Sequence, residues 1–183
     1  DNKTYQDELK EYFDIGDVSC DISSYWNRIY NKTASLFATA TESGAVLAGA
    51  SEQDAEKLKI YGNKIGMAFQ VMDDVLDITG SSSELGKPAG NDLAQGVMTL
   101  PSILFCSRYS SEDSVKRFMQ NPKDPEIIMK LSENVRDSSI IGECEAIIAE
   151  YCAEAIAQCN SLPRNKASDA LITLVEYLME RQN

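Results

Sequence analysis

The chain has 183 residues, of which 43% are hydrophobic and 25% are charged, so it is long enough to bury the core of one ordinary globular domain. Its net charge of −12 argues against a nucleic-acid partner, which would bind to a basic stripe. The absence of histidine excludes imidazole-based triads and most zinc enzymes.

Helical periodicity runs through the whole sequence, and strand alternation is not sustained anywhere, which predicts an all-α chain. A short helix is expected at 4–13. A second helix is expected to begin with Ser23 or Ser24 as its N-cap. It continues, with a kink near Asn31-Lys32-Thr33, to Leu47, and small residues in its second half allow close packing against another helix.

A long helix is predicted to begin after Ser51 and to stop at Gly80. Ser51 is a good N-cap, and Asp54 three residues later forms a weaker version of the capping box. The residues that follow, 80–92, are rich in Gly, Pro, Ser and Asn, which predicts a loop.

The last part of the chain is predicted to form five further helices with recognisable start signals. Pro is tolerated in the first turn of a helix, and Ser and Asp are favoured at the N-cap. The expected helices open at Leu100-Pro101, run from the cap Ser111 to Met119, from Asp124-Pro125 to about Val135, from Ser139 to Cys159, and from Asn165 to Glu180, the last burying Leu171, Leu174, Val175 and Leu178.

Three aspartates, Asp73, Asp74 and Asp77, stand near the end of the predicted long helix, with Gln70 one turn earlier. Positions three and four apart share a helix face, so the four side chains are expected to form one polar patch. Their neighbours are apolar, and no basic residue occurs from Ile65 through Gly80. Because carboxylates at this spacing repel one another and oxygen ligands suit Mg²⁺, the pattern predicts a metal–phosphate site in preference to a solvated acidic face.

Two lysines can cooperate with the aspartates. Lys32 and Thr33 lie at the predicted kink, where charge and hydroxyl could hold phosphate oxygens. Lys87 lies in the Gly- and Pro-flanked loop and could close over a metal-bound phosphate. Taken alone, the Lys32-Thr33 pair carries no weight, because surface lysines are common, and Lys87 is better explained as a solvated loop charge.

Four segments in chain order carry a family resemblance. They are Lys32-Thr33-Ala34-Ser35-Leu36, Gly66-Met67-Ala68-Phe69-Gln70-Val71-Met72-Asp73-Asp74-Val75-Leu76-Asp77, Leu85-Gly86-Lys87-Pro88-Ala89-Gly90-Asn91-Asp92-Leu93 and Gly96-Val97-Met98-Thr99-Leu100-Pro101. Together they resemble the trans-isoprenyl diphosphate synthases (polyprenyl synthetase family). The resemblance implies the isoprenoid-synthase type of helical bundle for a single domain at 1–183.

The resemblance also implies a site and a reaction. The second aspartate-rich motif of the family would bind Mg²⁺ bridged to an allylic diphosphate, and its residues here are Asp73, Asp74 and Asp77. The residues implied to contact that diphosphate or to line the allylic pocket are Lys32, Thr33, Gln70 and Lys87. The implied chemistry is metal-assisted ionisation of the allylic diphosphate, attack by the double bond of isopentenyl diphosphate and loss of a proton.

Two parts of the family pattern are not found in the sequence. They are the first aspartate-rich motif and an upstream Gly-Gly-Lys segment that grips isopentenyl diphosphate. The chain is therefore expected to be the C-terminal half or more of a synthase, lacking its N-terminal helices and inactive by itself. Apolar surface uncovered in this way would favour a homodimer or another partner.

Three other interpretations stay open at this point. The chain could be a non-catalytic or regulatory subunit of a heteromeric prenyl diphosphate synthase. A class I terpene cyclase also pairs an acidic helix with Mg²⁺, but of its Asn-Asp…Ser…Glu element only Asn91-Asp92 is present, because Gln95 and Thr99 stand where Ser and Glu are needed. A helical scaffold with an accidental acidic patch would need neither metal nor phosphate.

The cysteines and the hydropathy of the sequence indicate the cellular compartment of the protein. The five cysteines form an odd set without a CxxC pair, which is typical of a reducing cytosol. No run approaches 18 apolar residues, and the start Asp1-Asn2-Lys3 has no signal-peptide character. The sequence therefore predicts a cytoplasmic protein without a transmembrane segment.

Overall fold

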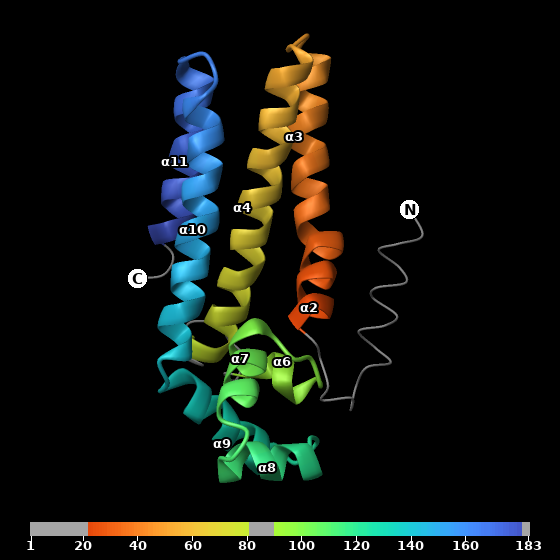
Figure 1. The fold of residues 1–183 in the computed structure, drawn as a ribbon, viewed down its shortest axis with the longest axis vertical. Coiled ribbons are helices and arrows are strands. Elements are labelled where there is room, and N and C mark those ends of the chain that lie inside the picture. Colours follow the sequence, from red (N-terminus) through yellow and green to blue (C-terminus); the bar gives the residue numbers. More distant parts are fainter. Residues whose placement is uncertain (1–21, 81–89, 181–183) are drawn as a thin grey trace. The chain divides into compact units, whose positions relative to one another are not determined.

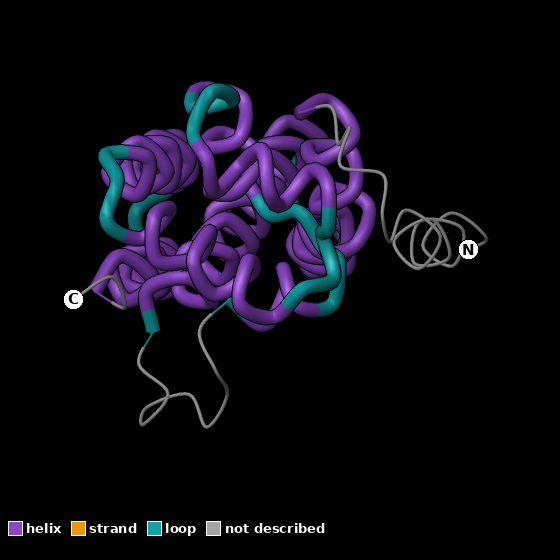
Figure 2. The backbone as a smooth tube through the Cα atoms, turned by 90° about the horizontal axis from the view of Figure 1, so that it is seen from below, coloured by secondary structure: helices purple, strands orange, loops and turns teal. Residues whose placement is uncertain are grey.

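The computed structural model describes residues 22–80 and 90–180, and within these two ranges all regular structure is helical (Figures 1 and 2). The all-α prediction is confirmed, whereas the helix expected at 4–13 lies outside the described residues. None of the described helices combines the length and the apolar character that a membrane span requires. The elements are α2 (Ile22–Ile29), the π-helix η1 (Tyr30–Ala34), α3 (Ser35–Leu47), α4 (Glu52–Thr79), α6 (Asn91–Ala94), α7 (Leu100–Arg108), α8 (Asp113–Gln120), α9 (Pro125–Arg136), α10 (Ile140–Asn160) and α11 (Lys166–Glu180).

The chain divides into two compact units, each of which is described separately. Among the described residues, unit 1 comprises 22–27, 73–80 and 90–145, and unit 2 comprises 28–72 and 146–180. Helices α2, α4 and α10 contribute residues to both units. The single domain expected from the sequence stays a prediction.

In unit 2, α3 and η1 pack closely against α4 because two glycines of α4 face them. A Cβ atom on Gly66 would lie 2.6 Å from the Cα of Ala34, and one on Gly62 would overlap the hydroxyl of Thr41. That hydroxyl donates a hydrogen bond to the Leu58 carbonyl at 2.6 Å, which ties the two helices together. The small residues therefore let the backbones approach, as the sequence predicted.

The outer face of α3 carries few polar groups. Glu42 is the one charged residue between Ser35 and Leu47, and it bonds to Lys59 at 3.2 Å. The side chains of Leu36, Val46 and Leu47 are 68%, 60% and 88% exposed. Apolar side chains on a helix normally lie against another part of a protein.

Helices α10 and α11 complete unit 2. Lys64 of α4 pairs with Glu154 of α10 at 2.6 Å, and the Tyr61 hydroxyl donates to the Leu171 carbonyl of α11 at 3.0 Å. Val175 and Leu178 are buried as predicted, but Leu171 is only half-buried and Leu174 is exposed. The predicted burial of all four α11 side chains is therefore wrong for these two.

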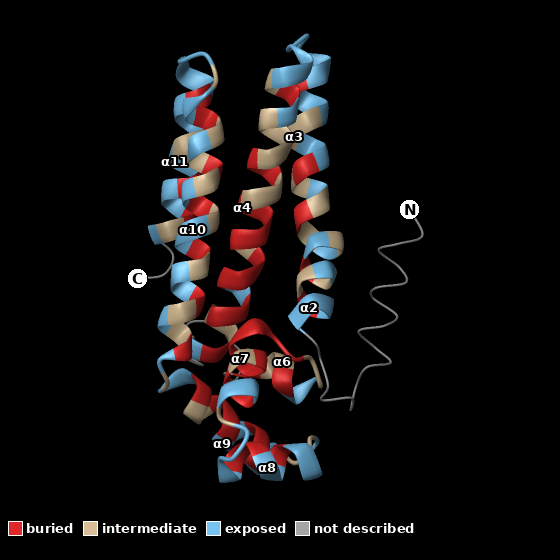
Figure 3. Ribbon diagram, in the orientation of Figure 1, coloured by how far each residue is buried: buried red, intermediate tan, exposed pale blue. Residues whose placement is uncertain are grey.

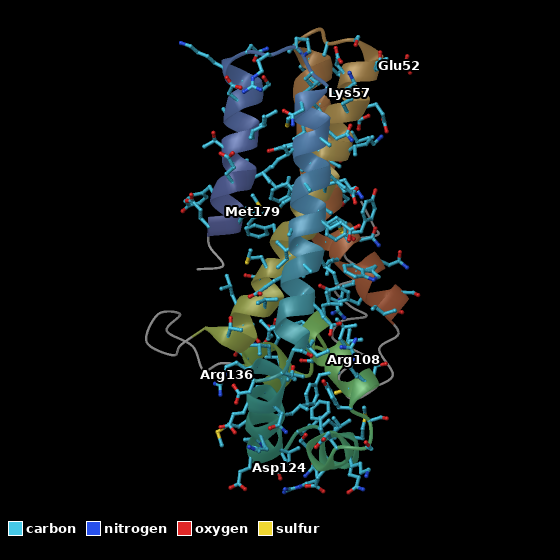
Figure 4. The ribbon with its side chains drawn as sticks, turned by 60° about the vertical axis from the view of Figure 1, so that its left-hand side comes forward. Glu52, Lys57, Arg108, Asp124, Arg136 and Met179 are labelled. Atoms are coloured by element: carbon cyan, nitrogen blue, oxygen red, sulfur yellow. The ribbon has the colours of Figure 1, made fainter. Side chains whose placement is uncertain are left out.

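Unit 1 is built largely from the short helices α6, α7, α8 and α9, whose buried residues appear in red in Figure 3. Asp124 caps α9 by accepting bonds from the N–H groups of Glu126 at 2.9 Å and Ile127 at 3.4 Å, and it is labelled at that end of the helix in Figure 4. Pro101 lies in the first turn of α7, as predicted. The predicted cap Ser111 is wrong, because α8 begins after Glu112.

Candidate functional site

The three aspartates at the end of α4 lie in unit 1 and differ in their surroundings. Asp73 is exposed, Asp77 is half-buried, and Asp74 is only 3% exposed. Helix α4 extends from its capping box at Ser51 and Asp54 to Thr79, as the sequence predicted. The regular spacing of this helix therefore determines the positions of the three aspartates relative to one another.

Asp77 contacts the backbone at the start of α6. Its Oδ2 atom accepts a hydrogen bond from the Asp92 N–H at 3.2 Å, and its carbonyl accepts one from the Gly90 N–H at 2.8 Å. Gly90 has φ 75°, a left-handed conformation that glycine adopts without strain, and α6 begins directly after it. The turn thus brings the Asp92 carboxylate into the neighbourhood of Asp77.

The carboxylates near Asp77 make its ionisation unfavourable. Burial and then the charge of Asp92 raise the pKa of Asp77 to about 6, with a smaller contribution from Asp73. The N–H groups of Asp92 and Asn91 act in the opposite direction. This part of unit 1 is an acidic group that a cation would stabilise.

Asp74 lies in different surroundings. The Tyr25 hydroxyl of α2 donates a hydrogen bond to its Oδ2 atom at 2.7 Å, and the Leu100 N–H of α7 approaches the same atom at 3.5 Å. Tyr25 is fully buried. The polar patch expected from the sequence is therefore divided, with Asp73 and Asp77 on one side and Asp74 within the packing of unit 1.

The donor chemistry fits Mg²⁺ at Asp73 and Asp77. In the two described ranges, no three His, Cys, Asp or Glu side chains converge on a single metal position. Mg²⁺ does not need such a cage, because it is commonly held by one or two carboxylates together with waters and substrate phosphates. The exposed Asp73 and the half-buried Asp77 are two such carboxylates, and the negative charge around Asp77 favours a bound cation.

In unit 2, Lys32 and Thr33 lie in the π-helical turn η1, where the sequence predicted a kink. Such turns widen a helix by one residue and are frequent at functional sites. The Thr33 hydroxyl donates a hydrogen bond to the Oε1 atom of Gln70 at 3.0 Å, and Gln70 is 9% exposed. Lys32 is exposed. The predicted N-caps Ser23 and Ser24 are wrong, because both lie inside α2.

Within each unit, then, the structure brings some of the predicted residues together. Thr33 meets Gln70 in unit 2, and Asp73 and Asp77 share a neighbourhood in unit 1. Lys87 lies outside the described residues. Sequence reasoning missed the part played by Tyr25 in holding Asp74. Tyr25 lies on the buried side of a short helix, and no spacing in the sequence connects it to Asp74.

Comparison with known sequences identifies relatives of this chain. A sequence model of the family described as polyprenyl synthetase matches residues 2–135. The chain is 30% identical over 175 residues to heptaprenyl diphosphate synthase component 2 of Bacillus subtilis (strain 168), a match that covers 96% of this chain and 50% of that protein. The chain thus spans about half the length of this relative.

Solved structures match nearly the whole chain. The crystal structure of heptaprenyl diphosphate synthase from Staphylococcus aureus is 30% identical with a TM-score of 0.84, covering 100% of this chain and 61% of that one. The crystal structure of polyprenyl synthase from Caulobacter crescentus CB15, complexed with calcium and isoprenyl diphosphate, is 30% identical with a TM-score of 0.86, covering 98% and 56%.

Proposed function

This chain belongs to the polyprenyl synthetase family, and on that premise we propose that it binds an allylic diphosphate with Mg²⁺ as part of a trans-prenyltransferase. The reaction is head-to-tail condensation of that allylic diphosphate with isopentenyl diphosphate. The chain spans about half of its relatives, so the activity of a whole synthase is part of the proposal.

The observation that carries the proposal is the cluster of carboxylates at Asp73, Asp77 and Asp92. Burial and the neighbouring carboxylates raise the pKa of Asp77 to about 6. Asp73 and Asp77 would hold the metal ion. When bound, Mg²⁺ supplies charge neutralisation for the departing diphosphate. Asp74, the third member of the motif, is buried against Tyr25. The calcium and isoprenyl diphosphate in the similar Caulobacter crescentus structure support ligands of this kind.

The family resemblance assigns further residues to the substrate. Lys32 would attract diphosphate oxygens by its charge, and Lys87 is proposed for the same task. The hydrogen bond between Thr33 and Gln70 fixes the orientation of both side chains, which the family resemblance assigns to the allylic pocket. A fixed amide and hydroxyl need little reorganisation when charge develops beside them.

Thermal unfolding with MgCl₂ and inorganic pyrophosphate tests the proposal. A ligand that binds only the folded chain raises Tm, by about 5 °C or more at a hundredfold excess over Kd. Asp73→Asn is expected to reduce this rise to about half or less, because a tenfold loss of affinity halves the stabilisation at this ligand concentration. Asp113→Asn, an exposed aspartate on α8 of the same unit, is the control and should keep it. An unchanged Tm of the unaltered chain under these conditions would refute the proposal.

Chain elongation is not expected from these 183 residues alone. The sequence contains one aspartate-rich motif, at Asp73–Asp77, whereas the family resemblance calls for two to clamp the diphosphate. The assay is incubation of purified chain with Mg²⁺, an allylic diphosphate and labelled isopentenyl diphosphate. Detection of a longer prenyl product would overturn this expectation.

A second candidate is a non-catalytic or regulatory subunit of a heteromeric prenyl diphosphate synthase. The similar Bacillus subtilis protein is named as component 2, which favours this alternative. The exposed side chains of Leu36, Val46 and Leu47 on α3 offer an uncharged surface for a partner or for a second copy in a homodimer. Light scattering of the purified chain tests the homodimer, and co-purification of a chain with the other acidic motif would favour the subunit.

We also propose a cytoplasmic location. Cys106, Cys144, Cys152 and Cys159 are buried free thiols, which suits a reducing compartment.

A further inference from the structure

The Asp74 carboxylate forms hydrogen bonds with two other helices of unit 1. Its Oδ2 atom accepts a hydrogen bond from the Tyr25 hydroxyl at 2.7 Å, a usual length for an O–H···O bond, and both side chains are buried. The two residues are 49 positions apart in the sequence, so this bond joins α2 to α4. A buried carboxylate with such a partner is costly to disturb.

The same carboxylate lies at the N-terminus of α7. The first N–H groups of a helix lack intrahelical partners and favour a nearby anion. Thr99, in the N-cap position of α7, makes no capping bond with its side chain. The Leu100 N–H is instead directed at Asp74 Oδ2, at 3.5 Å. Asp74 thereby takes part in holding α2, α4 and α7 together.

Helix geometry separates Asp74 from its two neighbours in the motif. Successive residues are rotated by roughly 100°, so Asp73 and Asp77 lie about 100° and 60° to the same side of Asp74. Asp73 is exposed and Asp77 faces Asp92, in agreement with this rotation. Because the three residues share one helix, the bond from Tyr25 to Asp74 helps to set the direction in which the other two carboxylates leave α4.

From this arrangement we propose that Asp74 is not a metal ligand, and that Tyr25 and Asp74 form a positioning pair that aims Asp73 and Asp77 at the metal. The inference rests on the proposed function, since it presumes that Asp73 and Asp77 bind Mg²⁺. It divides the aspartate-rich motif into two residues that bind the ion and one that orients them. Tyr25 becomes a residue on which metal affinity depends without touching the metal.

Isothermal titration calorimetry of the full chain with Mg²⁺ and inorganic pyrophosphate tests the inference, at a temperature where circular dichroism shows every variant folded. Asp74→Asn keeps an oxygen that can accept the Tyr25 hydroxyl, so its affinity is expected within about threefold of the unaltered chain. Asp73→Asn is expected to lose tenfold or more. Tyr25→Phe is expected to lose about tenfold, the lower end of the loss that follows removal of an orienting partner at a metal site. Tyr177→Phe, which removes the hydroxyl of a tyrosine that is 63% exposed, should leave the affinity unchanged.

The outcomes separate this inference from the proposed function. If Asp74→Asn weakens binding as much as Asp73→Asn does, Asp74 is a ligand and the inference is overturned while the proposed function stands. If Tyr25→Phe lowers Tm but leaves the affinity unchanged, Tyr25 is merely structural, and the positioning role is overturned. If the unaltered chain binds neither ion nor pyrophosphate, the proposed function fails and the inference falls with it.

Discussion

Substitution of Gly66 by alanine tests how closely η1 approaches α4. The new Cβ would lie 2.6 Å from the Cα of Ala34 and 3.2 Å from the Cβ atoms of Ala34 and Phe37. Ordinary carbon–carbon contacts lie at about 3.5–4.0 Å. The backbone of η1 would have to retreat by roughly 1 Å, because the nearest atom belongs to a main chain and not to a flexible side chain.

Two opposing terms set the magnitude. Alanine is favoured over glycine inside a helix by about 0.8–1 kcal/mol. Overpacking of a close contact costs about 1–3 kcal/mol, and displacement of η1 would also strain the hydrogen bond between Thr33 and Gln70, worth about 1 kcal/mol. The net expectation for Gly66→Ala is a loss of about 1–3 kcal/mol in the free energy of unfolding.

Urea unfolding at 25 °C measures this difference, and Gly44→Ala provides a matched control. Gly44 lies in α3 of the same unit, and a Cβ there would meet no atom within 4 Å. Gly44→Ala is therefore expected to gain about 0.5–1 kcal/mol from helix propensity alone. If Gly66→Ala is as stable as Gly44→Ala, the close approach of η1 to α4 is refuted.

Three further predictions concern stability without ligand. Asp124→Ala removes the α9 cap and is expected to cost about 0.5–2 kcal/mol in urea unfolding, so an unchanged midpoint would contradict the capping role. Asp77→Asn removes one of several carboxylates that repel one another, so it should raise the urea midpoint of the metal-free chain. The same substitution should abolish the response of the chain to Mg²⁺ and pyrophosphate. A lowered midpoint would show that the charge of Asp77 is structural. The third concerns buried thiols, whose pKa burial raises from 9.0 to about 11 or 12. Between these pKa values the folded chain keeps protons that the unfolded chain loses. The free energy of unfolding is therefore expected to be steady below pH 9 and to fall as the pH rises toward 11, by at most about 1.4 kcal/mol per pH unit for each thiol. A flat profile above pH 9 would contradict this prediction. These thiols are Cys106, Cys144, Cys152 and Cys159.

Features that depend on neighbours in the sequence could be predicted. Ser51 and Asp54 bond to each other three residues apart, and Asp124 accepts from N–H groups two and three residues later. Such bonds depend on backbone geometry within one turn. The sequence therefore indicated where α4 and α9 begin, and helical spacing indicated the aspartates on α4.

Features that depend on distant packing could not be predicted. Tyr25 and Asp74 are far apart in the sequence, and nothing near either residue indicates the other. Leu174 fits the apolar period of α11 but is 48% exposed, because periodicity identifies an apolar face without showing what covers it. Ser111 is a good N-cap by type, yet the backbone turns one residue later, at Glu112.

The buried cysteines give each unit its own internal reporter of opening. Cys106 lies in unit 1, and Cys152 and Cys159 lie in unit 2. A bulky thiol reagent can reach a buried sulfur only when the surrounding helices open, so the labelling rate at each position measures a local opening free energy. Equal values for the two units would mean that the chain melts as one cooperative body, whereas unequal values would show which unit yields first.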